Sequence, residues 1–259
     1  MPNPMRQGLT STGLLLAALA LWEGGVRLAH VPPYLLPPPS HILATLVADL
    51  PLLLHHAGIT LSEVGLGLLL GTAGGIAVAL VGFYVPAIGR ALRPFLLASQ
   101  VVPVFAIAPL LVLWFGYGRG PKVIVVGLIS FFPIAVSLGE GLGAVGEDLV
   151  DLLRTLGARE GKILRLVRLP AATPFALAGL KVGATLALAG AIIGEWIGGT
   201  GGLGYIMIQA NALLRADRVF AALFVLTLLG VGLFASLSLL ERYLLRWRPN
   251  PSPSRIGVR

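Results

Sequence analysis

Residues 147–170 read EDLVDLLRTLGAREGKILRLVRLP, and this charged stretch lies between two long apolar runs. The runs cover about 123–145 and about 174–197. Each is long enough to cross a membrane, since a transmembrane helix needs roughly 20 mostly apolar residues. The stretch is therefore predicted to be a loop that connects two membrane-spanning helices and lies outside the bilayer.

The first half of this loop has the pattern of a short amphipathic helix. Acidic residues precede Arg154, an order that suits the helix dipole, and Gly157 is expected to end the helix. A second, basic helix is expected to follow and to end before Pro170. Such helices lie on a lipid surface or bind in a groove of another protein, and physics alone leaves both open. The apolar side chains at i, i+3, i+4 and i+7 are Leu149, Leu152, Leu153 and Leu156.

The composition of the whole chain indicates an integral membrane protein. Its 259 residues are 56% hydrophobic and 12% charged, whereas a soluble domain carries about 25% charged residues. The apolar runs return along the chain as far as Leu245, so a cleaved signal peptide does not explain them. We expect an all-α membrane protein with one transmembrane domain over 1–259, a core at about 55–245 and a cytoplasmic tail over 246–259.

Six spans are predicted, and their continuous Leu- and Ala-rich runs do not fit the alternation of barrel strands. Before the core, residues 1–54 hold the first span, a proline-rich external segment and a short helix that Ser40 is expected to cap and that ends near Leu54. The predicted spans are about 13–28, 58–82, 95–115, 123–145, 174–197 and 219–244.

The distribution of basic residues predicts the orientation. Thirteen of the 19 Lys and Arg residues fall in segments on one side of the spans, five fall on the other side, and Lys181 lies within a span. Basic residues favour cytoplasmic loops, so both termini are predicted to be cytoplasmic. The same bias explains the net charge of +8 without a nucleic-acid partner.

Several kinds of chemistry are excluded. The chain has no cysteine, and its four histidines form no HExxH motif, so no catalytic pair or metal site is predicted. Two GxGxxG matches, at 141–146 and 199–204, lack the βαβ context of a dinucleotide site. Ile163 follows Lys162 where a phosphate-binding loop needs Ser or Thr, so this chain is not expected to hydrolyse nucleotide.

Glycines four residues apart predict close helix contacts. They let two backbones approach each other, either as static packing or as a contact that slides during a transport cycle. The two sets are Gly67, Gly71 and Gly75 in the second span and Gly190, Gly194 and Gly198 in the fifth.

Charged residues within spans are costly, and they are often functional. Glu195 has two interpretations, a role in gating or in the solute path, and an interfacial residue paired with a neighbour. Gln100 is a polar candidate for the path, and Pro103 and Pro109 could kink the third span and free carbonyls to line a cavity. The candidates among the charged residues of the predicted spans are Glu63, Glu140, Lys181 and Glu195.

The loop resembles the EAA loop of ABC importer permeases, in which an acidic residue, a glycine and a Leu-Pro pair recur at this spacing. Asp151 stands for the usual Glu, and Leu152 and Leu153 replace small alanines. Further segments resemble the nitrate/sulfonate/taurine branch of these permeases, although Glu63 stands where a basic residue is expected. They include 36–40, 103–118, 131–134, Glu195, 201–204 and 241–247.

The resemblance implies a type I ABC importer permease fold in the plasma (inner) membrane, with no cofactor on this chain. Its implied partners are a second permease copy in a homodimer, an ABC ATPase subunit that holds ATP and Mg²⁺, an external solute-binding protein and membrane lipid. In this interpretation the loop couples the permease to the ATPase. The implied coupling residues are Asp151, Leu152, Leu153, Arg154, Leu156, Gly157, Ala158, Leu169 and Pro170.

The sequence leaves the substrate and two rival classes open. The resemblance implies a solute like nitrate, a sulfonate or taurine, and the alternative is a thiamine-precursor pyrimidine or another small organic solute. A stand-alone channel or secondary transporter would also have room in six spans, although neither requires the loop. An intramembrane enzyme would need a catalytic pair at bilayer depth, which the pattern does not offer.

Overall fold

The computed structural model describes residues 4–99 and 103–247, and every regular element in these ranges is helical. Short turns join most of the helices, and a π-helical turn at Leu164–Arg168 joins α8 to α9. The helices are α1 (Pro4–Leu28), α2 (Pro39–Ala48), α3 (Leu50–Tyr84), α4 (Pro86–Ser99), α5 (Val104–Phe115), α6 (Arg119–Gly143), α7 (Glu147–Thr155), α8 (Glu160–Ile163), α9 (Leu169–Gly198), α10 (Leu203–Ala212) and α11 (Ala216–Leu244).

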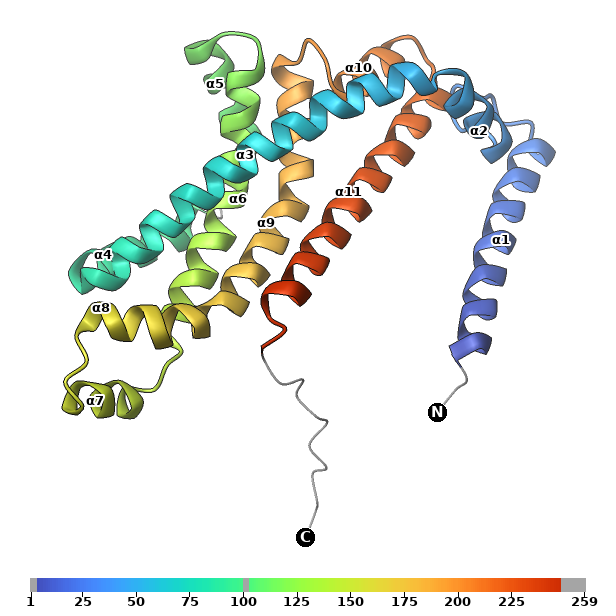
Figure 1. The fold of residues 1–259 in the computed structure, drawn as a ribbon. Helices are drawn as coiled ribbons and strands as arrows, with labels where there is room; N and C mark the ends of the chain where they lie inside the picture. The colour runs from blue at the N-terminus through green and yellow to red at the C-terminus, as the bar shows by residue number, and fades with distance from the viewer. Residues whose placement is uncertain (1–3, 100–102, 248–259) are drawn as a thin grey trace.

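Helices α3, α6 and α9 pack side by side, with α6 in contact with both of the others (Figure 1). Glycines on α3 make the first contact possible, because a Cβ atom at Gly67 or Gly71 would overlap Val126 or Ser130 of α6. At Gly75 an added Cβ would lie 2.9 Å from Ile134. The predicted glycine face of the second span is therefore a close helix contact.

The contact of α9 with α6 follows the same principle. A Cβ at Gly190 would lie 2.8 Å from Ile129, and one at Gly194 would lie 3.2 Å from Lys122 of α6. Gly198 continues this face to Val112 of α5. Both predicted glycine sets thus bring backbones together, and whether these contacts slide stays a prediction.

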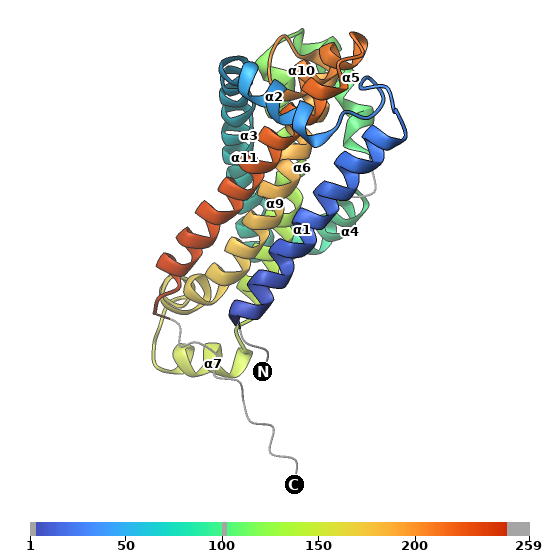
Figure 2. The same ribbon diagram turned by 90° about the vertical axis from the view of Figure 1, so that its right-hand side faces the viewer.

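The remaining helices surround this layer. Helix α11 packs against α2, α9 and α10, where Leu53, Leu203 and Ala221 are fully buried in one apolar cluster. Helix α1 lies at the edge and joins α2, with the Trp22 ring 5.7 Å from Phe220 of α11. In two views α7 lies at the same end of the molecule as the start of α1 and the end of α11, and α2 and α10 lie at the other (Figures 1 and 2). We name these the α7 end and the α10 end.

Four helices in the described ranges are long and apolar enough to cross a membrane: α3, α6, the continuous stretch 160–198 and α11. They correspond to the predicted second, fourth, fifth and sixth spans. Helix α1 covers the predicted first span but is not among these four. The predicted third span is split into α4 and α5, and α5 has 12 residues, about 18 Å, too short to cross alone.

Three local predictions are wrong. The short helix that was expected to end near Leu54 ends at Ala48, and residues 50–54 already belong to α3. Ser40 does not cap α2, because the helix begins at Pro39, and the Ser40 hydroxyl instead donates to the Glu23 carboxylate of α1 at 2.7 Å. The second loop helix does not end before Pro170 but continues through the π-helical turn into α9. Pro170 has no N–H to donate, and it is tolerated here in the first turn of α9.

Candidate functional site

A C-terminal capping motif at Gly157 ends helix α7 and sets the course of the loop at the α7 end. Gly157 has φ +82°, its N–H donates to Arg154 O, and the Ala158 N–H donates to Leu153 O, which together form a Schellman motif. A Cβ at Gly157 would meet no atom within 4 Å, so the requirement for glycine is conformational. The sequence prediction that Gly157 ends this helix is confirmed.

The leucines of α7 divide between two faces. Val150 is fully buried and packs with Ile163 of α8, and Leu153 joins this cluster. Leu149, Leu152 and Leu156 are 46%, 56% and 75% exposed. The predicted single stripe is therefore partly wrong, since Leu153 anchors α7 to its own loop and the other three form an outward apolar face.

Exposed ion pairs bracket the turn. Arg154 donates to Asp151 at 2.9 Å and to Glu160 at 2.7 Å. These two hydrogen bonds raise the pKa of the Arg154 guanidinium, and the bond that Glu160 accepts has the larger effect. The outward face and this charged turn form one surface at the α7 end. Leu169 and Pro170, the other predicted coupling residues, lie at the start of α9 and outside this surface.

The α10 end holds a second polar site, a buried cluster. Glu63 of α3, Lys122 of α6 and Glu195 of α9 are 0%, 2% and 1% exposed. Lys122 Nζ donates to Glu63 Oε1 at 2.5 Å and to Gly201 O at 3.3 Å. The second oxygen of Glu63 has no hydrogen-bond partner among the described residues.

Glu195 holds the turn that leads from α9 to α10. Its carboxylate accepts hydrogen bonds from the Thr60 hydroxyl at 2.7 Å and from Gly204 N–H at 2.6 Å. Thr60 in turn accepts from Leu203 N–H at 2.9 Å, and His56 Nδ1 accepts from Gly202 N–H at 3.0 Å. The buried cluster thus fixes residues 201–204 onto α3 and α9.

Sequence reasoning found the two carboxylates of this cluster but missed their partners. Lys122 lies just outside the predicted span at about 123–145, whereas the structure places it in α6 against Glu63. A signal was present: His56, Thr60 and Glu63 recur at i, i+4 and i+7, which places three polar groups on one side of an apolar helix.

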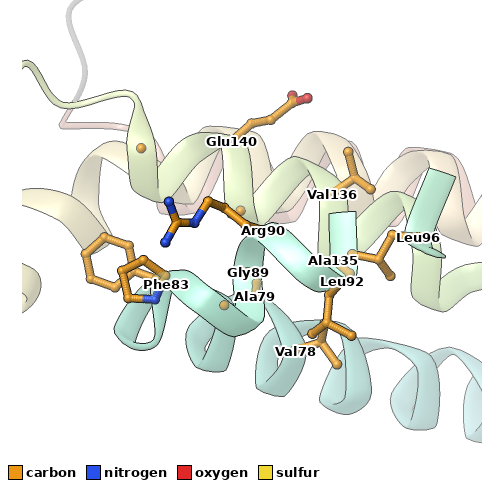
Figure 3. A pocket seen from close by; sticks show the side chains of 14 residues that line it. Val78, Ala79, Phe83, Gly89, Arg90, Leu92, Leu96, Ala135, Val136 and Glu140 are labelled. Carbon is orange, nitrogen blue, oxygen red and sulfur yellow. The ribbon is translucent and has the colours of Figure 1, made fainter. Parts of the chain in front are cut away.

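A cavity of about 460 Å³ lies between α3, α4 and α6 (Figure 3). Its lining is mostly apolar, with Phe83 at one end and Leu96 toward the other, and Arg90 and Glu140 are its charged residues. The structure places Pro103 as the residue before α5 and Pro109 inside it, and neither these nor Glu195 lines this cavity. Gln100, the remaining path candidate, lies outside the described residues.

Lys181, the last of the four charged candidates in the predicted spans, is paired. Lys181 of α9 forms an ion pair with Glu241 of α11, and its ammonium lies 5.5 Å from the Phe234 ring centroid. No group of His, Cys, Asp or Glu in the described part of the chain could hold a metal ion. Together these features define a multi-span helical membrane protein with a structured loop projecting from one end of its bundle.

The chain belongs to the family of binding-protein-dependent transport system inner membrane components, whose model matches residues 42–247. A probable ABC transporter permease protein of Haemophilus influenzae is 40% identical over 227 residues, which cover 87% of this chain and 93% of the relative. The formylaminopyrimidine transport permease protein ThiX of Halalkalibacterium halodurans is 38% identical and covers 93% and 97%. The riboflavin transport system permease protein RibX of Chloroflexus aurantiacus is 35% identical and covers 93% and 90%.

Permeases of the predicted branch are also similar to this chain. A putative aliphatic sulfonates permease of Bacillus subtilis is 31% identical over 91% of the chain and 87% of the relative. The taurine permease of Escherichia coli is 30% identical, covering 93% and 90%. In a solved structure of the inward-facing methionine ABC transporter MetNI, one chain has a TM-score of 0.67 at 19% identity, covers 76% of this chain and 98% of its own, and shares the fold.

This chain is accordingly a multi-pass inner-membrane permease subunit of an ABC importer. Subunits of this family are not catalytic, and ATP and Mg²⁺ belong to a partner ATPase. The family also implies an external binding protein as a partner. The assignment sets aside the intramembrane enzyme and the stand-alone channel or secondary transporter.

Proposed function

We propose that the outward face of α7, formed by Leu149, Leu152 and Leu156, docks in a groove of the ATPase subunit. The exposure of these three leucines on a helix that the Gly157 turn holds at the end of the bundle is the observation that carries this proposal. An amphipathic helix that presents apolar residues at i, i+3 and i+7 is suited to bind in a protein groove. Asp151 and Arg154 flank this face and would give the contact its polar rim.

The orientation and the assembly follow from this docking. With α7 in the cytoplasm, the ends of α1 and α11 that share its side of the bundle would be cytoplasmic too, as the excess of basic residues on that side of the predicted spans favours. We place two copies of the permease in the complex. Exposed apolar side chains on α5 and α9, such as Leu113, Trp114 and Val182, offer a surface for the second copy.

Transport would use ATP to bias two arrangements of the bundle. A ligand shifts such an equilibrium only through different affinities for the two states, and here the ATPase would supply that difference through α7. Glu195 is assigned to the outer gate as the residue that holds the 201–204 turn, because its two oxygens bond to Thr60 and Gly204. Pro103, Pro109 and Gln100 stay candidates for the path along the third span.

For the solute we favour a small heteroaromatic compound of the thiamine-precursor pyrimidine type. The mostly apolar cavity that Phe83 and Leu92 line suits a flat ring, and the relative named for formylaminopyrimidine shares more residues with this chain than those named for sulfonates or taurine. A sulfonate, taurine or nitrate is the second candidate, and Arg90 in the cavity lining is the observation that favours an anion.

Two charge insertions test the docking. Leu152→Glu places a charge on the outward face of α7, and Leu213→Glu places one at the α10 end, where the leucine is 69% exposed. We expect the Leu152→Glu variant not to capture the ATPase subunit in detergent. In proteoliposomes it should show no ATP-driven uptake of labelled formylaminopyrimidine or taurine. The Leu213→Glu variant should retain the ATPase. Equal capture by both variants would contradict the docking surface.

A further inference from the structure

Arg168 is a buried cation at the junction between the loop and the bundle. It closes the π-helical turn that leads into α9, and the residue is 7% exposed. Its Nη1 donates to the carbonyl of Leu142 in α6 at 3.1 Å, and its Nη2 lies 3.6 Å from Glu147 Oε1 of α7. Its guanidinium carbon lies 4.9 Å from the centroid of the Phe83 ring in α3.

These contacts bring three helices, α3, α6 and α7, to the side chain of Arg168. Burying a guanidinium costs free energy that its partners must offset, and a carbonyl, a carboxylate and an aromatic face are the groups that do so. The offset is incomplete, because Arg168 Nε has no hydrogen-bond partner among the described residues. A merely structural junction of apolar side chains would avoid this cost, so the position of Arg168 calls for another explanation.

The contacts of Arg168 differ in how easily they can be broken. Those with Leu142, which is fully buried, and Phe83 lie inside the bundle. The contact with Glu147 is longer, and the Glu147 side chain is 71% exposed, so this pair can open and close at little cost. The contacts of Arg168 with the bundle are therefore fixed, whereas its ion pair with Glu147 of α7 can be exchanged.

The contacts of Arg168 inside the bundle extend to the cavity. Phe83, whose ring lies beside the guanidinium, also lines the cavity of about 460 Å³ between α3, α4 and α6 (Figure 3). A continuous series of contacts thus runs from Glu147 at the start of α7 through Arg168 to Phe83 at the cavity wall. A series of packed side chains can couple two distant sites energetically when one of the elements that it joins has two discrete arrangements.

We propose that Arg168 is a positioning residue that transmits displacement of α7 to the cavity wall, with the Glu147 pair as its adjustable contact. This inference rests on the proposed docking of α7 on an ATPase. Opening the pair would leave the ATPase bound and hydrolysing but would weaken the link to Phe83. Loss of the pair should therefore raise the ATP consumed per solute without releasing the ATPase.

Two matched variants test this role, Glu147→Gln and Asp148→Asn. Each removes one negative charge from the first turn of α7, but Glu147 faces Arg168, whereas Asp148 forms no ion pair among the described residues. In reconstituted complexes we expect Glu147→Gln to raise ATP hydrolysed per solute about two- to fivefold, the size of a typical coupling effect, with unchanged ATPase capture. Asp148→Asn should match the wild type.

A third variant separates positioning from simple stability. Because Glu147 acts through Arg168, adding Glu147→Gln to Arg168→Met should change the ratio no further than Arg168→Met alone. Equal ratios for Glu147→Gln and Asp148→Asn, or additive effects in the double variant, would overturn the role of Arg168. A wild-type complex without ATP-driven uptake would instead contradict the proposed function itself.

Discussion

The two ends of the bundle use the same kinds of charged residue in opposite surroundings. At the α7 end, Arg154 bonds to Asp151 and Glu160, and all three side chains are at least 46% exposed. At the α10 end, Lys122 and Glu63 are at most 2% exposed. Solvent screens the first set, so its pairs exchange partners easily, whereas breaking the second leaves a charge buried without a partner. The α10 end is built to hold its geometry, whereas the exposed groups of the α7 end can change partners.

The sharpest contrast between the ends is the effect of removing one cation. Lys122→Met leaves Glu63 and Glu195 buried together without an ammonium group. We expect it to lower the free energy of unfolding by about 3–5 kcal/mol, as for other broken buried pairs. Unfolding of the purified permease in mixed detergent measures this change.

Two further variants serve as controls for that experiment. Adding Glu63→Gln to Lys122→Met removes the carboxylate that had paired with the ammonium group, leaves Glu195 with its bonds to Thr60 and Gly204, and should restore part of the lost stability. Arg154→Met removes a cation from the exposed turn and should leave the unfolding transition where it is. If Lys122→Met and Arg154→Met were equally stable, the contrast between the two ends would be wrong.

A smaller effect is expected from the hydroxyl that joins Glu195 to the 201–204 turn. Thr60→Val keeps the shape of the side chain but removes its bonds to the Glu195 carboxylate and from Leu203 N–H. Leaving those buried groups unsatisfied should cost about 1–3 kcal/mol of unfolding free energy. Thr227→Val is the matched control, because Thr227 is exposed and its hydroxyl bonds to a carbonyl of its own helix. A stable Thr60→Val protein would show that the turn is held by other contacts.

Gly157→Ala is expected to have the smallest effect on stability. Its main effect should be on function. Alanine at φ +82° strains the turn by about 1–2 kcal/mol, and the strain is confined to the loop. We expect weaker capture of the ATPase and slower uptake, with unchanged unfolding of the bundle.

Gly161→Ala is the control for this prediction, since Gly161 also has open space around it but no positive φ. It should behave as the wild type in capture, uptake and unfolding. The role of the turn would be contradicted if Gly157→Ala matched Gly161→Ala in both capture and uptake.

Local patterns in the sequence predicted the local structure well. The charge order of α7, its stop at Gly157 and the glycine face at Gly67 and Gly71 all follow from helical spacing and backbone conformation. Four of the six expected spans are long, apolar helices for the same reason. The loop prediction failed where tertiary packing decides, since spacing alone cannot tell that Leu153 turns inward to its own loop while Leu152 stays exposed.

Contacts between distant segments could not be predicted. Glu63, Lys122 and Glu195 come from three helices, and no spacing within one sequence reveals that their side chains meet. The cavity likewise depends on α4 folding back along α3, where the Gly82 and Gly89 backbones approach closely. The continuity of α8 with α9 could not be predicted, because proline commonly ends a helix, whereas Pro170 lies in the first turn of α9.

The central claim is that the outward face of α7 contacts a separate ATPase subunit. The chain has no cysteine, so Leu152→Cys and Val150→Cys each introduce a unique thiol, one on the outward face and one fully buried. A short thiol-reactive crosslinker applied to the assembled transporter should join position 152, and not position 150, to the ATPase subunit. Crosslinks from position 152 to lipid alone, with the ATPase present and unlabelled, would contradict the account.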